Sequence, residues 1–150
     1  CVEFFVKPDR GAGYFNFEFN CGGTLHASYI RDHTRTDGGF RDYTLLPPAD
    51  AEQIGRFHSM PRRVLPEIQE PQDWLLEFSI PFDLLECYTG TLGQIAGRRW
   101  QANFYKCGDK TSHPHWLSWA PLPERNFHLP EHFAGIRFEN PRWLCSARAL

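Results

Sequence analysis

Residues 107–121, with the sequence CGDKTSHPHWLSWAP, hold several side chains that could carry chemistry. The stretch contains a thiol, an aspartate, two histidines and two tryptophans. It could hold a nucleophilic cysteine beside a basic histidine, or it could place aromatic rings next to a ligand that is bound without being altered. It could also bind a metal ion through Cys107, Asp109, His113 and His115.

A zinc site in this stretch has one favourable feature. His113 and His115 are two positions apart, and side chains at positions i and i+2 of a strand share a face, so both imidazoles could reach one ion. Cys107 and Asp109, however, fall on a glycine-containing loop, and no second paired motif completes a tetrahedral ligand set. The pattern disfavours zinc and leaves the ligands of any metal undefined.

A calcium ion is a second metal to consider. Residues 32–39, DHTRTDGG, offer Asp32, Asp37 and two hydroxyl groups. They lack the spacing and the terminal glutamate of an EF-hand loop. We retain a structural calcium ion between loops as an expectation, without assigning its ligands.

Catalysis by this chain is not favoured. A cysteine or serine nucleophile needs a base that a third group holds in place, and no local signature marks Cys107 or Ser118 in this way. Paired carboxylates could hydrolyse glycosides, and Glu3, Glu18 and Glu77 all fall on expected strands. Nothing in the sequence places any two of them at the required separation.

Aromatic and planar polar residues alternate along several segments, which suits the recognition of a sugar. A sugar has an apolar C–H face on which a ring can stack, and its hydroxyls both donate and accept hydrogen bonds. Trp74, Trp100 and Trp119 are predicted for the core. The interleaved aromatic and planar polar residues are Glu3, Asn16, Asn103, Trp116, Asn126, Phe127 and His128.

The elements that must position these residues read as short strands. Aromatic residues make up 15% of the 150-residue chain, and 12 glycines and 12 prolines interrupt it, so few segments could form a long helix. In residues 14–20, Phe15, Phe17 and Phe19 alternate with polar residues, which is typical of a half-buried strand. The expected strands are residues 1–6, 14–20, 24–30, 40–46, 74–80, 100–107, 115–121 and 133–140.

The remaining segments are connections. Pro81 at the start of residues 81–86 predicts one short helix. Residues 31–39 read as a polar loop and residues 61–73 as a proline-rich connector, whereas residues 50–60 fit either a helical turn or an edge strand. The fold prediction is therefore all-β: a single domain over residues 1–150, built as an antiparallel two-sheet β-sandwich with one short helix.

Composition excludes some functions. The net charge of −2 and the lack of clustered lysine and arginine argue against a nucleic-acid partner. No apolar run approaches the roughly 20 residues that span a bilayer. The five cysteines are odd in number and form no CxxC pair, so we expect free thiols and no dense disulfide framework.

Five motifs occur in an order that resembles the family 9 carbohydrate-binding modules, and most closely their family 9-like bacterial branch. They are VEFFV, YFNFEFN, WQANFYKC, SWAP and NFHLPEHFAGIRFE, within residues 1–139. The resemblance implies a non-catalytic β-sandwich that binds an oligo- or polysaccharide, together with bound calcium. It also implies attachment to secreted glycoside hydrolases, polysaccharide catabolism, and an extracellular or periplasmic location.

The resemblance also implies roles for particular residues. The strand glutamate that bonds sugar hydroxyls in the family falls on Glu3, and a polar strand residue, often arginine, falls near Asn16. One ring of the family's aromatic slot falls on Phe127, where tryptophan is typical, with Asn126 beside it. His128 would flank the sugar, and Asn103 and His113 are further expected contacts.

The family's second slot ring lies upstream of the VEFFV strand. Because the sequence opens directly in a strand, without methionine or signal peptide, we expect N-terminal strands to precede it in the natural protein, and we expect half a slot and an exposed sheet edge in this chain. Two alternatives remain open. One is a structural or interaction β-sandwich without sugar affinity, and the other is a haem-binding relative that ligates iron through Met60 and a histidine.

Overall fold

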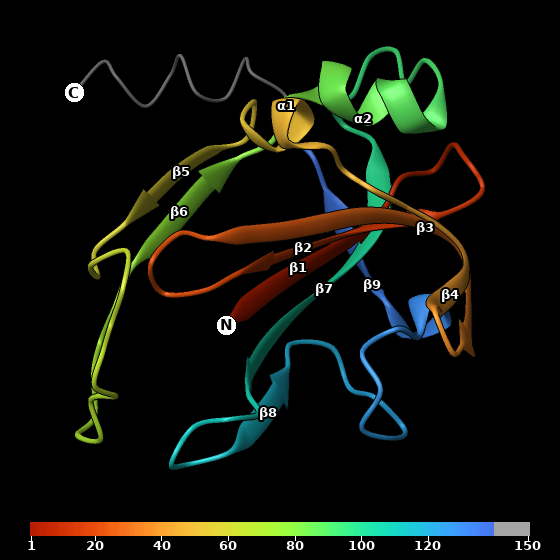
Figure 1. Cartoon of the computed structure of the whole chain (residues 1–150). Coiled ribbons are helices and arrows are strands. Elements are labelled where there is room, and N and C mark those ends of the chain that lie inside the picture. The colour runs from red at the N-terminus through yellow and green to blue at the C-terminus, as the bar shows by residue number, and fades with distance from the viewer. Residues whose placement is uncertain (140–150) are drawn as a thin grey trace.

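The computed structural model describes residues 1–139 and shows an all-β chain with two antiparallel sheets, as predicted (Figure 1). The large sheet has seven strands in the order β4-β3-β2-β1-β7-β8, with β9 also paired to β7, and β5 and β6 form the second sheet. The strands are β1 (Val2–Lys7), β2 (Tyr14–Phe19), β3 (Leu25–Thr36), β4 (Gly39–Leu45), β5 (Gly55–His58), β6 (Leu76–Ser79), β7 (Arg99–Gly108), β8 (His115–Ser118) and β9 (Ala134–Arg137).

Three short helical segments accompany the sheets. The predicted helix is α2 (Phe82–Thr89), which begins directly after Pro81. The ambiguous residues 50–60 divide between the end of a four-residue helix, α1 (Pro48–Ala51), and strand β5, and a 3₁₀ turn, η1 (Pro130–His132), precedes β9. Within residues 1–139, no helix combines the length and the apolar character needed to cross a bilayer. The expected end of the last strand at Asn140, and Cys145, lie outside the described residues.

The polar loop expected over residues 31–39 is wrong, because residues 31–36 continue strand β3. Thr36 pairs with Gly39, so the chain reverses through Asp37 and Gly38 in a tight hairpin turn. The charged residues of this hairpin form cross-strand pairs on its exposed surface. Asp32 accepts a hydrogen bond from the Arg41 guanidinium at 3.1 Å, and Arg31 pairs with Asp42. Opposite charges across the strands explain how a polar sequence forms a strand here.

Strand β1 occupies the middle of the large sheet, between β2 and β7, and is therefore not an edge. One face of this sheet carries Phe15, Phe17 and Phe19, as the alternation predicts, and all three are fully buried. The hairpin β5–β6 and helix α2 cover that face (Figure 1). For example, the rings of Phe19 and Phe78 stack with their centroids 4.7 Å apart.

Much of the opposite face of the sheet is buried as well, so the expectation of a half-buried strand is wrong for β2. Phe5, Tyr14, Ile30, Tyr105 and Phe133 form a second core there. The segment between β8 and β9 packs over it, because Leu122 and Phe127 contact this core. Polar residues of the alternating pattern therefore lie inside the protein and must find hydrogen-bond partners there.

Of the three tryptophans predicted for the core, only Trp100 is fully buried, at 3% exposure. Trp74 is half-buried, and the prediction for Trp119 is wrong, since 55% of that residue is exposed. Trp119 follows the short edge strand β8, where no second layer covers its ring. Its ring contacts Phe104 edge to face, with centroids 5.6 Å apart.

Asn103 of β7 is fully buried and connects that strand to the segment after β8. Its side-chain Nδ2 donates to the carbonyl of Ala120 at 3.2 Å, while its Oδ1 accepts from the backbone N–H groups of Phe104 and Ala120. The asparagine thus acts as a polar clamp between two segments.

We expect Asn103→Ala to lower the free energy of unfolding by at least about 2 kcal/mol, because each buried group left without a partner costs about 1–3 kcal/mol. Urea unfolding measures this change. Gln101→Ala is the matched control, since Gln101 lies on the same strand with an exposed side chain. If both variants lose the same free energy of unfolding, Asn103 does not stabilise the fold by connecting these two segments.

Candidate functional site

A pocket of about 330 Å³ lies against the second, polar-lined face of the large sheet. Larger hollows exist elsewhere, but this one gathers buried titratable groups and aromatic rings from distant parts of the chain. It is lined by Glu3, Glu18, Arg35, Cys107, Asp109, Trp116, Arg125, Asn126, Phe127 and His128.

The floor of the pocket carries two neighbouring carboxyl groups. Glu3 of β1 lies directly opposite Glu18 of β2 in the antiparallel register, so both side chains project from the same face. The side-chain Nδ2 of Asn16 donates to Glu18 Oε1 at 2.7 Å, and the Asn16 Oδ1 accepts from the backbone N–H of Ser28 at 3.0 Å. Asn16 therefore orients Glu18 from below.

Burial raises the pKa of both carboxyl groups. It raises the pKa of Glu18 to about 7, and the neighbouring Glu3 adds to this rise. Burial also raises the pKa of Glu3 above its ordinary value, although the Cys107 thiol opposes this by donating to the carboxyl at 3.1 Å. Near neutral pH the pair can offer both hydrogen-bond donors and acceptors.

The surroundings of the Cys107 thiol disfavour a nucleophilic role. Burial and the hydrogen bond to Glu3 raise the pKa of the Cys107 thiol to about 12, so the thiolate is scarce at neutral pH. Ser118 is exposed on β8.

Two aromatic rings line the pocket from different segments. The Phe127 ring stacks on Tyr105 with centroids 4.1 Å apart, and the Tyr105 hydroxyl donates to the Phe127 carbonyl at 2.9 Å. Trp116 of β8 donates from its indole Nε1 to Asp109 at 2.6 Å. The Arg125 guanidinium lies over the indole, 4.3 Å from the ring centroid. Both rings are therefore held in place by neighbours in the protein.

His128 and Asn126 complete the wall beside Phe127. The ring nitrogen Nδ1 of His128 shares a hydrogen bond of 2.8 Å with the Tyr14 hydroxyl. Burial, together with the nearby Arg35, lowers the pKa of His128 to about 3, so the ring is neutral at ordinary pH. Asn126 Oδ1 accepts from the His128 backbone N–H at 3.0 Å.

The structure brings four of the sequence-predicted site residues into this pocket, namely Glu3, Asn126, Phe127 and His128. Asn16 lies beneath it and contacts Glu18. Asn103 and His113 are not among the lining residues: Asn103 serves as the clamp described above, and His113 is exposed next to Ser112.

Several lining residues did not emerge from the sequence as site residues. Arg35 and Arg125 carry no signal in the sequence, and Trp116 is only one of the interleaved aromatic residues. Glu18 is indicated only as a candidate catalytic carboxylate, and Cys107 and Asp109 only as candidate metal ligands or, for Cys107, a nucleophile. The register of β1 against β2 would have identified Glu18, because pairing residues 2–6 with residues 15–19 places it opposite Glu3. Arg35 lies in the part of β3 where the sequence predicts a loop, and Cys107 lies near the end of β7. The remaining residues come from loops and a short edge strand, where no periodicity indicates direction.

The metal sets considered from the sequence are not assembled in the described part of the chain. His115 Nδ1 contacts the carbonyl of His113 at 2.7 Å, and its Nε2 lies 2.6 Å from the Lys106 ammonium, so both ring nitrogens are engaged. Asp32 pairs with Arg41, and among residues 1–139 neither Asp32 nor Asp37 belongs to a cluster of three potential ligands.

The pattern of a family described as Carbohydrate-binding family 9 matches residues 1–138, which is nearly the whole chain. The chain belongs to carbohydrate-binding family 9. It is a carbohydrate-binding module, and the pocket with its rings and carboxyl groups is the candidate site for the saccharide.

A crystal structure of a Bacteroides uniformis protein described as carbohydrate-binding is similar to this module, with a TM-score of 0.72 and 32% sequence identity. The match covers 93% of this chain and 61% of that chain, so the module spans about three fifths of that protein's length. Among curated proteins, none matches this chain.

We expect Glu18→Gln to flatten the pH dependence of the module's stability. A carboxyl group whose pKa is higher in the folded state stabilises the fold below its unfolded pKa, and this stabilisation is lost as the pH rises through the folded value. For Glu18 the stabilisation is lost between pH 4.5 and about pH 7, and the free energy of unfolding falls by about 3 kcal/mol over this range. Glutamine stays neutral and can still accept from Asn16.

Urea unfolding of both proteins between about pH 4.5 and pH 8 measures this difference. The variant should gain stability relative to the wild type as the pH rises. Glu77→Gln on β6 is the control, because Glu77 is exposed. If the free energy of unfolding changes with pH in the same way for the wild type and Glu18→Gln, the pKa of Glu18 is not raised.

Proposed function

We propose that the module binds a saccharide non-covalently in the pocket whose floor is Glu3 and Glu18 and whose rings are Trp116 and Phe127. The supporting observation is the convergence of two aromatic rings, the buried Glu3 carboxyl and the half-buried Glu18 carboxyl in one hollow of about 330 Å³. That volume is within the range of small-molecule sites. The rings suit the apolar face of a pyranose, and the polar floor suits its hydroxyls.

Each polar lining residue has a role in this proposal. Glu3 and Glu18 accept from sugar hydroxyls when ionised and donate to them when protonated. Asn126 has an amide that both donates and accepts, while His128 flanks the sugar and Asn16 supports Glu18 from beneath. Asn103 and His113 have no part in the proposed contacts.

The placement of the two carboxyl groups favours binding without bond cleavage. Glycoside hydrolysis requires two carboxyl groups that flank the scissile bond. Glu3 and Glu18 extend from adjacent strands of one sheet face, so both reach a ligand from the same side. This arrangement supports a module that holds a sugar and leaves its linkages intact.

Family membership also supports a wider biological setting. We infer that the module, a single domain over residues 1–150, is attached to or works with secreted glycoside hydrolases in polysaccharide catabolism, outside the cell or in the periplasm. A structural calcium ion remains an expectation from the family resemblance.

We expect Phe127→Ala and Trp116→Ala each to weaken glycan binding by about tenfold or more. Loss of a ring that becomes buried against a sugar removes roughly 1.5–3 kcal/mol, and each 1.4 kcal/mol is about tenfold in affinity. The measurement is affinity electrophoresis in a soluble β-glucan and a soluble xylan, followed by calorimetry with oligosaccharides of the polymer that is retained.

Trp119→Ala is the matched control, because Trp119 is an exposed ring outside the pocket. It should leave retention unchanged. If the wild type is retained and both pocket variants bind as tightly as it does, the site is wrong. If the wild type binds no member of a broad glycan panel, a structural or interaction role replaces sugar binding.

A further inference from the structure

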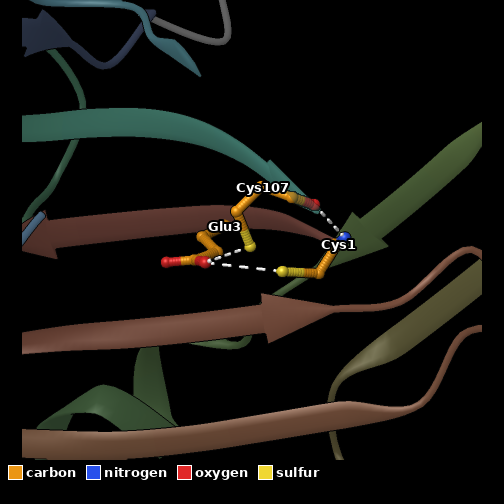
Figure 2. Close-up of side chains that lie close together, drawn as sticks. All are labelled: Cys1, Glu3 and Cys107. Carbon is orange, nitrogen blue, oxygen red and sulfur yellow. Dashed lines mark hydrogen bonds between the residues drawn. The ribbon is translucent and has the colours of Figure 1, made fainter. Parts of the chain in front are cut away.

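Three potential metal ligands meet at one end of the pocket floor. Cys1 directly precedes β1. Its amino group donates to the Cys107 carbonyl at 2.7 Å, and its carbonyl accepts from the Cys107 N–H at 3.0 Å. Residues paired in this way face the same side of an antiparallel sheet. Glu3, two residues beyond Cys1, projects from that side too, and Figure 2 shows all three side chains converging.

The donor atoms of these residues are close enough to share an ion. Glu3 Oε1 lies 3.1 Å from the Cys107 sulfur and 3.4 Å from the Cys1 sulfur. All three donor atoms lie within 4.8 Å of one another. In a tetrahedral zinc site, with bonds of about 2.3 Å to sulfur and about 2.0–2.2 Å to oxygen, neighbouring donors are separated by roughly 3.5–3.8 Å. Small side-chain movements would therefore suffice.

The donor types select the kind of ion. Two thiolates and one carboxylate suit a borderline-soft divalent cation, whereas calcium and magnesium require a shell of oxygen ligands. Glu3 and Cys107 also line the pocket, so a fourth coordination position would open toward it. Three protein ligands with an open position are typical of zinc sites that exchange a bound molecule.

We propose that Cys1, Glu3 and Cys107 form a binding site for a thiophilic divalent cation, best suited to Zn²⁺, at the floor of the pocket. Each thiol releases its proton to solvent when the ion binds, so the two thiolates and the carboxylate face a dication. This site does not depend on saccharide binding, and its test needs no sugar.

The test is a titration of the full chain with Co²⁺, which replaces Zn²⁺ in tetrahedral thiolate sites and gives a thiolate-to-metal charge-transfer band. The chain is first stripped with a chelator and reduced with a phosphine. We expect one Co²⁺ per chain and displacement of the band by Zn²⁺. Cys1→Ser and Cys107→Ser should each weaken binding by more than about 100-fold, since even outer-shell changes cost about 10–100-fold.

Cys87→Ser is the matched control, because Cys87 is an exposed free thiol on helix α2. It should leave the Co²⁺ affinity unchanged. Cys107 is buried, so circular dichroism must show that its variant is folded, and Cys1→Ser, at a half-buried position, carries the test if it is not. Glu3→Gln should weaken binding by about tenfold or more through loss of the carboxylate.

Three results would overturn the site. The first is the absence of a charge-transfer band with the reduced wild type, and the second is a band of equal affinity in folded Cys1→Ser. The third is a Cys1–Cys107 disulfide that forms equally fast with and without excess Zn²⁺. In that assay oxidised glutathione accepts the two electrons from the thiols, and a bound ion should protect both sulfurs.

Discussion

The pairing of β1 with both β2 and β7 is the constraint on which the rest of the module depends. The antiparallel register on each side fixes which residues share the polar face: Glu3 lies opposite Glu18 on one strand and opposite Tyr105 on the other. A slip of one residue would turn every one of these side chains to the other face of the sheet. The buried aromatic face prevents such a slip, because Phe15, Phe17 and Phe19 would lose their core.

Polar groups of β7 then determine where the pocket wall lies. Asn103 bonds the backbone at Ala120, and the Tyr105 hydroxyl bonds the backbone at Phe127, so one strand holds both ends of the segment that closes the pocket. Burying amide and hydroxyl groups is favourable only when they are paired, and here the pairing is with the backbone of this segment. The interior hydrogen bonds of the sheet thus position the residues that line the pocket.

The first core face and part of the pocket could be predicted from the sequence. The wrong expectations for the second face of the sheet, for Asn103 and for Trp119 share a cause. The alternation of phenylalanine in residues 14–20 identified one core face, and the match of motifs to a known family placed Glu3 and Phe127, which line the same pocket. The burial of the second face could not be foreseen, because the segment that covers it has no periodic pattern. The same lack of pattern explains two wrong expectations. The sequence predicts that Trp119 is buried, whereas its ring is exposed. It predicts that Asn103 contacts a ligand, whereas Asn103 bonds the backbone of Ala120.

The stacking of Phe127 on Tyr105 has a consequence for the binding that we propose. One face of the phenyl ring is already occupied, so only the other face is open to a guest. A ring that is fixed before the encounter loses little rotational freedom when the guest arrives, and this lowers the entropic cost of association. A phenyl ring is smaller than an indole, but rigidity of this kind offsets part of the lost contact area, and the stacking leaves the guest one face of the ring to contact.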